Sequence, residues 1–297
     1  MKNTVFTGAA TAVITPFTRE GINWDAFGRL IDFQIAGGIN ALVVAGTTGE
    51  GSTLTDREHE ELVAFGVKRT AGRVPVIAGT GSNNTAHAIE RTKSACAAGA
   101  DAVLLVTPYY NKTTQRGLIA SFSAIADESS VPCILYNVPS RTGLNMLPET
   151  LAELAKHERV AAVKEACGSI SQVAKELELC GDALDVYSGN DDQTVPVLSL
   201  GGKGVISTVG NIVPAEMAEM CRRFFEGDVK GAAALQLKLL SLMNQTMIET
   251  NPIPVKAACA AMGFGEYILR LPLVEMEEGN RLKLLRLMKE QGLEVAE

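Results

Sequence analysis

Short apolar runs alternate with helical patterns over most of the chain. Apolar residues fill both faces of each run, which is typical of a buried strand in a parallel sheet. A polar segment follows each run, and apolar residues at helical spacing come next. The pattern therefore predicts strands over residues 8–17, 41–45, 74–78, 103–106, 133–136, 160–164, 184–187 and 204–206.

These repeated strand-helix units predict a (β/α)8 TIM barrel. A single unit cannot bury both faces of its strand, whereas a closed ring of eight units can. An open doubly wound sheet is the alternative, but it usually has fewer strands, and no Gly-x-Gly-x-x-Gly follows the first run. Two helix boundaries are also marked: a helical pattern over 23–36 closes at Gly37-Gly38, and Thr55 with Glu58 forms a capping box.

The alternation stops near Asp228, and only helical patterns follow. They cover residues 235–247, 255–262 and 280–291, with a turn at Asn251-Pro252-Ile253-Pro254. We therefore expect a barrel over residues 1–227 and a helical C-terminal extension over 228–297. The extension is expected to pack on the barrel or on a neighbouring subunit instead of forming an independent domain.

Composition and charge point to small-molecule partners. With 46% hydrophobic and 21% charged residues, the chain of 297 residues has the composition of an ordinary soluble globular protein. A net charge of −7 without a cluster of Lys and Arg argues against nucleic acid or an anionic membrane surface. No apolar run approaches the length of a membrane span.

The cysteines predict a reducing compartment. The six residues are widely spaced, form no Cys-x-x-Cys pair and follow no apolar N-terminal segment, so we interpret them as buried, reduced thiols of a cytoplasmic protein. They are Cys96, Cys133, Cys167, Cys180, Cys221 and Cys259.

A lysine, Lys164, closes the sixth predicted strand. A lysine at a buried strand end is commonly a residue whose stem packs while its ammonium reaches water. The alternative is a Schiff-base lysine, because desolvation at a strand end lowers the pKa and raises the fraction of neutral amine that can attack a carbonyl. The strand alone does not decide between the two, so the residues around it matter.

Further polar residues follow the predicted strands. In a barrel, the segments after the strands meet at one rim, where catalytic groups lie. Each tyrosine alone is typical of a half-buried amphipathic residue with its hydroxyl in solvent. Hydroxyls, phenols, a guanidinium and an amine on the same rim indicate a site instead. The residues expected to converge are Thr47, Thr48, Tyr110, Tyr136, Arg141 and Lys164.

Several other chemistries are disfavoured. A metal site is not expected, because the three histidines His59, His87 and His157 lie on separate predicted helices without ligand spacing. Asp191-Asp192 could hold a cation, but we expect this pair to cap the helix after the seventh strand. Gly201-Gly202-Lys203-Gly204 resembles a phosphate loop, yet it precedes the eighth strand and so faces the opposite rim.

Imine chemistry on a carbonyl compound remains, and it needs no cofactor. Arg141 suits carboxylate recognition through its bidentate fork, and threonine hydroxyls with backbone amides suit a second carboxylate. The sequence therefore predicts small keto acids as substrates.

Four segments carry a family resemblance. Together with the strand order and the turn at residues 251–256, they resemble the signatures of the dihydrodipicolinate synthases, within the N-acetylneuraminate lyase superfamily, over essentially the whole chain. The superfamily shares the lysine and the tyrosine of the fifth strand, whereas Thr47-Thr48 and Arg141 favour the synthases over the sialate lyases. The segments are Gly46-Thr47-Thr48-Gly49-Glu50, Thr107-Pro108-Tyr109-Tyr110-Asn111, Tyr136-Asn137-Val138-Pro139-Ser140-Arg141-Thr142 and Val163-Lys164-Glu165-Ala166.

The resemblance implies a lysine and diaminopimelate biosynthetic lyase. Its substrates would be pyruvate and L-aspartate 4-semialdehyde, joined through an imine on Lys164. Tyr136 would relay protons between Thr47 and Tyr110, and Tyr110 would enter from a neighbouring subunit of a homotetramer built from tight dimers. Thr48 would hold the pyruvate carboxylate.

For the remaining site positions, the resemblance implies that Arg141 holds the carboxylate of the semialdehyde. Gly189 and Ile206 would line the pyruvate site through their backbone groups.

An allosteric lysine site is also implied, at the subunit interface. His59, Asn83 and Tyr109 match positions used there, but His87 replaces the glutamate that would pair with the ammonium of the inhibitor. A histidine near its usual pKa carries no fixed negative charge at neutral pH. We therefore expect weak or absent inhibition by L-lysine, although His87 could equally be a solvated helix residue without a role.

Two other functions stay open. One is a relative that makes or cleaves a sugar acid through the same imine, and Arg141 with Thr47-Thr48 argues against it. The other is a catalytically silent barrel that senses a metabolite. The intact group of Lys164, Tyr136 and Tyr110 argues against a silent barrel.

Overall fold

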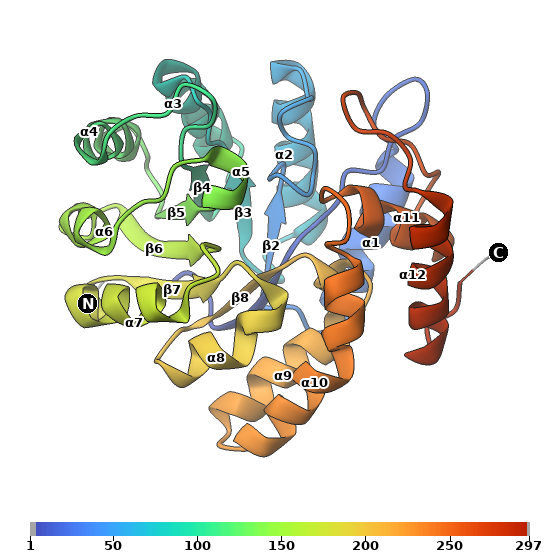
Figure 1. Ribbon diagram of the computed structural model, residues 1–297. Coiled ribbons are helices and arrows are strands. Elements are labelled where there is room, and N and C mark those ends of the chain that lie inside the picture. The colour runs from blue at the N-terminus through green and yellow to red at the C-terminus, as the bar shows by residue number, and fades with distance from the viewer. Residues whose placement is uncertain (1–3, 296–297) are drawn as a thin grey trace.

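The computed structural model describes residues 4–295, and its eight parallel strands close into a barrel (Figure 1). The strands pair in sequence order, and β1 closes the ring against β8 with Ala10 beside Ile206. The predicted TIM barrel is confirmed. The strands are β1 (Gly8–Ala12), β2 (Ala41–Val44), β3 (Val76–Gly79), β4 (Ala102–Val106), β5 (Cys133–Asn137), β6 (Val160–Glu165), β7 (Asp185–Ser188) and β8 (Gly204–Ser207).

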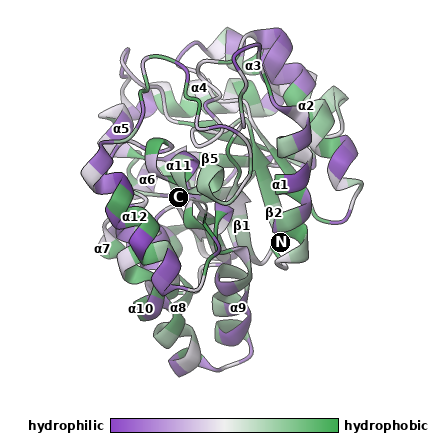
Figure 2. Ribbon diagram, turned by 90° about the vertical axis from the view of Figure 1, so that its right-hand side faces the viewer, coloured by the Kyte–Doolittle hydropathy of each residue, from purple (hydrophilic) through white to green (hydrophobic). Residues whose placement is uncertain are grey.

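The strands are apolar on both faces because each face is covered. In β2, Ala41 and Val43 belong to the cluster that fills the barrel, whereas Leu42 and Val44 pack outward with the helices. Successive side chains alternate in this way along every strand. Figure 2 shows the result as a hydrophobic centre with hydrophilic residues on the outer faces of the helices.

Helices surround the barrel, and local signals in the sequence set where some of them begin. Asn23 caps α1, and the predicted capping box between Thr55 and Glu58 is confirmed at the start of α2. The helices are α1 (Trp24–Ala36), α2 (Asp56–Thr70), α3 (Thr85–Ala97), α4 (Gln115–Asp127), α5 (Pro139–Thr142), α6 (Pro148–Leu154), α7 (Ile170–Cys180), α8 (Thr194–Ser199) and α9 (Pro214–Phe225). Short 3-10 turns add η1 (Gly181–Ala183), η2 (Asp191–Gln193) and η3 (Val209–Asn211).

Three further helices follow the barrel: α10 (Val229–Gln245), α11 (Ile253–Ala261) and α12 (Glu278–Glu290). In Figure 1, α10 runs beside α9, and α12 lies with α11 on the outside of the barrel. Helix α10 begins earlier than its apolar pattern predicts, because the Asp228 carboxylate accepts a hydrogen bond from the amide of Gly231 and caps it.

Two further observations bear on the composition of the chain. Within residues 4–295, no helix combines the length and the apolar character that crossing a membrane needs. None of the six cysteines forms a disulfide there, and four are buried. Cys96 and Cys167 are only half-buried, so the expectation of burial is wrong for these two; Cys96 lies in the last turn of α3 and Cys167 in the loop after β6.

Candidate active site

Lys164 lies at the carboxyl end of β6 and is only 4% exposed. The strand register places it beside Tyr136 of β5 and Tyr187 of β7. Its Nζ atom is 4.5 Å from the centroid of the Tyr136 ring. The amine therefore lies inside the end of the barrel and not on the outer surface, which argues against a lysine that only packs its stem.

Burial changes the acid-base chemistry of this lysine. Desolvation lowers the pKa of Lys164 to about 8; the negative charge of Asp191 opposes this shift, and the positive charge of Arg141 adds to it. An amine with a pKa of about 8 is about half neutral at a pH of about 8, whereas an exposed lysine is almost entirely protonated there. The site thus supplies a nucleophilic amine near neutral pH.

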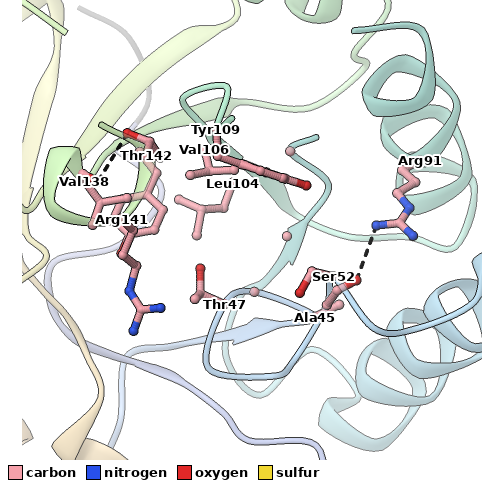
Figure 3. Close-up of a pocket in the computed structure, with 15 residues that line it drawn as sticks. Ala45, Thr47, Ser52, Arg91, Leu104, Val106, Tyr109, Val138, Arg141 and Thr142 are labelled. Atoms are coloured by element: carbon pink, nitrogen blue, oxygen red, sulfur yellow. Dashed lines mark hydrogen bonds between the residues drawn. The ribbon is translucent and has the colours of Figure 1, made fainter. Parts of the chain in front are cut away.

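A cavity of about 60 Å³ surrounds the amine and brings most of the predicted rim together. It adjoins a larger cavity of about 250 Å³, and the two share Thr47, Tyr136 and Arg141. Figure 3 shows Arg141 and Arg91 at opposite ends of the larger cavity. The predicted residues that line the smaller one are Thr47, Thr48, Tyr136, Arg141, Lys164 and Gly189.

Two predicted residues lie outside this lining. Ile206 is buried in the core of the barrel, where it packs with Tyr187 and other inward-facing residues. Tyr110 is 92% exposed and has a left-handed backbone with φ of 70°. In residues 4–295, no hydrogen bond joins the hydroxyl of Tyr136 to Thr47 or to Tyr110, so the predicted relay is not assembled within a single chain.

Asn251 joins two of the predicted residues. The side-chain amide of Asn251 donates to the Thr48 hydroxyl over 2.9 Å. Its backbone carbonyl accepts from the Arg141 guanidinium, also over 2.9 Å. Asn251 follows α10, and it lines the smaller cavity together with Met247. Sequence reasoning missed this role, because nothing in the turn itself indicates that it folds over the rim.

A buried ion pair holds the loop after β2. Glu50 and Lys256 of α11 form a short ion pair, and both side chains are 1% exposed. Burial lowers the pKa of Lys256 to about 8, although the Glu50 carboxylate opposes this. Ala45 and Glu50 have φ of 57° and 53°, a left-handed conformation that non-glycine residues rarely adopt. The ion pair therefore fixes the Glu50 end of the loop that carries Thr47 and Thr48.

The prediction that Asp191-Asp192 cap the helix after the seventh strand is wrong. Both residues lie inside the 3-10 turn η2, and α8 has no side-chain cap. Asp191 is buried and accepts hydrogen bonds from the amides of Thr208 and Val209, over 3.1 and 2.8 Å, at the start of η3. Burial raises its pKa, although its charge still acts on Lys164.

Tyr136 is buried and lies between the two cavities. Burial raises the pKa of its phenol to about 12, and the charge of Arg141 opposes this. The phenol is therefore neutral at physiological pH. It can donate a proton and take one back without remaining ionised.

The residues of the implied lysine site have their own partners. The Nε2 atom of His59 is 2.8 Å from the Gly79 carbonyl, and burial lowers the pKa of this histidine. Asn83 donates to the carbonyl of Tyr109 over 3.2 Å.

His87 packs against a carboxylate of the neighbouring helix. Its Nε2 atom is 2.7 Å from Asp56, which also accepts from Arg91. Of the four positions implied for an inhibitor, only Tyr109 lines the larger cavity. Arg91, which the sequence did not single out, lines it as well and donates to the carbonyl of Gly51 (Figure 3).

The part of the chain that the structure describes contains no group of three or more His, Cys, Asp or Glu side chains that could hold a metal ion. The smaller cavity presents one amine, one phenol, hydroxyls, side-chain amides and a guanidinium. Such a set binds carboxylates and attacks a carbonyl carbon.

Comparison with known proteins identifies the family. The profile of the dihydrodipicolinate synthetase family matches residues 5–291. The 4-hydroxy-tetrahydrodipicolinate synthase of Thermoanaerobacter sp. (strain X514) is 52% identical over 290 residues, 97% of this chain and 98% of the relative. The chloride-inhibited dihydrodipicolinate synthase of Acinetobacter baumannii, solved in complex with pyruvate, is 39% identical with a TM-score of 0.95, and the match covers 98% of this chain and 100% of that one.

A structure described as the first monomeric dihydrodipicolinate synthase variant is 43% identical, with a TM-score of 0.95 over 97% of this chain and 98% of that one. The profile, the relative and both structures extend over nearly the whole chain. The resemblance inferred from the sequence motifs is confirmed, and this chain belongs to the dihydrodipicolinate synthetase family.

Proposed function

We propose that this chain is a 4-hydroxy-tetrahydrodipicolinate synthase that condenses pyruvate with L-aspartate 4-semialdehyde through an imine on Lys164. The observation that carries the proposal is the buried amine of Lys164, whose pKa is lowered to about 8, in a cavity shared with Thr48 and Arg141. Family membership supports the same reaction.

The first step is imine formation. The neutral Nζ of Lys164 attacks the keto carbon of pyruvate, and the carbinolamine loses water to give the imine. Tyr136, whose ring lies 4.5 Å from Nζ, supplies the proton that the departing hydroxyl needs and takes one back afterwards. No metal takes part in this scheme.

The two carboxylates of the substrates need separate partners. Thr48 holds the pyruvate carboxylate through its hydroxyl and backbone amide, with Gly189 on the neighbouring wall. Arg141 holds the carboxylate of the semialdehyde with its guanidinium fork. The hydrogen bonds that Asn251 makes to both residues support a fixed spacing between the two carboxylate sites. The backbone groups of Ile206 also line the pyruvate site in this proposal.

Carbon-carbon bond formation follows. The imine loses a proton from the methyl carbon to give an enamine, and that carbon adds to the aldehyde of the semialdehyde. The amine of the semialdehyde then attacks the imine carbon and closes the ring, and Lys164 leaves as the free amine. No oxidant or reductant is needed.

The proton relay extends beyond one chain in this proposal. Tyr110 is exposed, has a left-handed backbone and lies outside the lining of both cavities of its own chain. We place it in the site of a neighbouring subunit, where it completes a relay with Tyr136 and Thr47 in a homotetramer of two tight dimers. The free thiols support a cytoplasmic location.

The test is turnover of pyruvate with L-aspartate 4-semialdehyde, followed by a coupled reductase, beside pyruvate with N-acetylmannosamine. Product with the semialdehyde alone is expected. Product with the sugar alone would be consistent with the imine on Lys164. It would show that Arg141 does not select the semialdehyde and that the chain is a sugar-acid aldolase. No product with either, from folded protein, would favour a silent metabolite-binding barrel.

A further inference from the structure

Two buried glutamates lie behind the amine, outside the cavity. Glu165 ends β6 and is 3% exposed, and Glu176 of α7 is fully buried. Because successive side chains of a strand point to opposite faces, Glu165 points away from the cavity that Lys164 faces and toward the helix layer. The charge of Glu165 acts directly on Glu176 there. Neither glutamate takes part in the imine mechanism.

Glu165 has the partners of an ionised carboxylate. The amide of Cys167 donates to its Oε1 over 2.6 Å. The side-chain amide of Asn137, on β5, donates to its Oε1 and Oε2 over 3.1 and 3.0 Å. N–H donors on both oxygens stabilise the negative form. The negative charge of this pair of glutamates therefore belongs to Glu165.

Glu176 has the partners of a neutral acid. Gln172 donates to its Oε1 over 2.9 Å, and its buried Oε2 receives no hydrogen bond from any donor in residues 4–295. The carboxylate of Glu165 interacts directly with this carboxyl, and two carboxyls can form a hydrogen bond only through a shared hydrogen atom. Burial and the neighbouring charge raise the pKa of Glu176. Two adjacent buried carboxyls keep one proton between them.

We propose that Glu176 is a protonated acid that donates its Oε2 hydrogen to Glu165, and that this pair is a positioning element for the imine reaction. The positioning role rests on the proposed function, whereas the shared proton does not. Glu165 binds Asn137, and these two residues directly follow Lys164 and Tyr136 in paired register. The pair thus ties together the ends of the two strands that present the amine and the phenol.

The other titratable groups around the pair are few. The thiol of Cys167 lies beside Glu165, and burial and that charge raise its pKa. The phenol of Tyr136 feels the same charge from β5. Helix α6, which packs on α7, carries only exposed acids at Glu149 and Glu153, and α8 carries none. The buried thiol of Cys180 lies one turn along α7. None of these groups is a cation, so none of them would allow both glutamates to be ionised together.

The replacement Glu176→Gln tests the shared proton. Its amide N–H replaces the O–H donor and cannot ionise. A free glutamate has a pKa near 4.5, so above that pH the folded wild type holds a proton that the unfolded chain has lost, until the pH reaches the raised pKa of Glu176. The stability of the wild type therefore falls with rising pH in that window, relative to Gln.

The measurement is urea unfolding from a pH of about 6 to about 8 at fixed protein concentration. We expect the ratio of the unfolding equilibrium constants of wild type and Glu176→Gln to rise about tenfold per pH unit. The control Glu178→Gln removes an exposed acid of the same helix. It should show no such slope. A ratio independent of pH for Glu176→Gln would overturn the shared proton.

The positioning role needs a catalytic readout. We expect kcat of the wild type to fall at alkaline pH as the proton leaves Glu176, and kcat of Glu176→Gln to stay level there, with KM for pyruvate unchanged. An identical fall of kcat at alkaline pH in both proteins would overturn the positioning role. If the wild type turned over no pyruvate with the semialdehyde, the proposed function would fail, and the unfolding slope would still decide whether the proton is present.

Discussion

The ion pair between Lys256 and Glu50 is expected to control both stability and the pyruvate site. The replacement Lys256→Met removes the cation and leaves Glu50 buried, with the backbone amide of Arg270, at 3.0 Å, as its remaining donor within residues 4–295. Both side chains of the pair are 1% exposed, so water does not screen the interaction. Breaking a buried pair from one side typically costs about 3–5 kcal/mol. We expect a loss of this size in the free energy of unfolding.

Urea unfolding followed by circular dichroism measures the loss. The double replacement Glu50→Gln with Lys256→Met should recover most of it, because no unpaired charge then stays buried. Lys175→Met is the matched control: Lys175 pairs with Glu178 on the surface, and its replacement should leave stability unchanged. A loss below about 1 kcal/mol for Lys256→Met, the range of surface pairs, would refute the reasoning. KM for pyruvate should rise, because Glu50 ends the loop that carries Thr48.

Four further outcomes are expected. Tyr136→Phe should lower kcat by about 10² to 10⁴, the scale of a lost proton-transfer group, and an unchanged steady-state rate would remove Tyr136 from the relay. Because the pKa of Lys164 is about 8, kcat/KM for pyruvate should fall about tenfold per pH unit below it. Asp191→Asn should move this fall of kcat/KM to lower pH, because the negative charge of Asp191 favours the ammonium form of Lys164. A fall at the same pH as in the wild type would contradict the influence of Asp191 on Lys164. L-lysine should inhibit weakly or not at all, because His87 carries no negative charge and already contacts Asp56, and submillimolar inhibition in the coupled assay would contradict this.

The barrel and its reactive rim follow from local signals in the sequence. Apolar runs mark the strands. Tyr136 and Lys164 close two of these runs and Thr47 follows a third, and the closed barrel brings all three to one cavity. Only the first run is much longer than its strand. Beyond Ala12 the chain leaves the sheet, and Phe17 forms only an isolated bridge with Ile22.

The contacts that support the site could not be predicted, because they join distant segments. Asn251 reaches Thr48 across most of the chain, and Lys256 reaches Glu50 in the same way. A lysine at position 256 looks like an ordinary helix residue until the packing of α11 buries it. Glu176 likewise lies in a helix with charged neighbours, and only the tertiary packing of α7 makes it a buried acid beside Glu165.

The position of Asp191 shows the same limit. An aspartate before a helical pattern predicts a cap, but the chain inserts the 3-10 turn η2 first, and the carboxylate instead reaches the amides that follow β8. Which helix it caps depends on the closure of β7 against β8, which no local pattern specifies.

The central claim is that pyruvate forms an imine on Lys164. The most direct measurement is reduction of the protein with borohydride in the presence of pyruvate, followed by peptide mass spectrometry. We predict that the reduced pyruvyl adduct lies on Lys164 and that Lys164→Ala gives no adduct while remaining folded. An adduct on another lysine, or none on a wild type that turns over both substrates, would contradict the account.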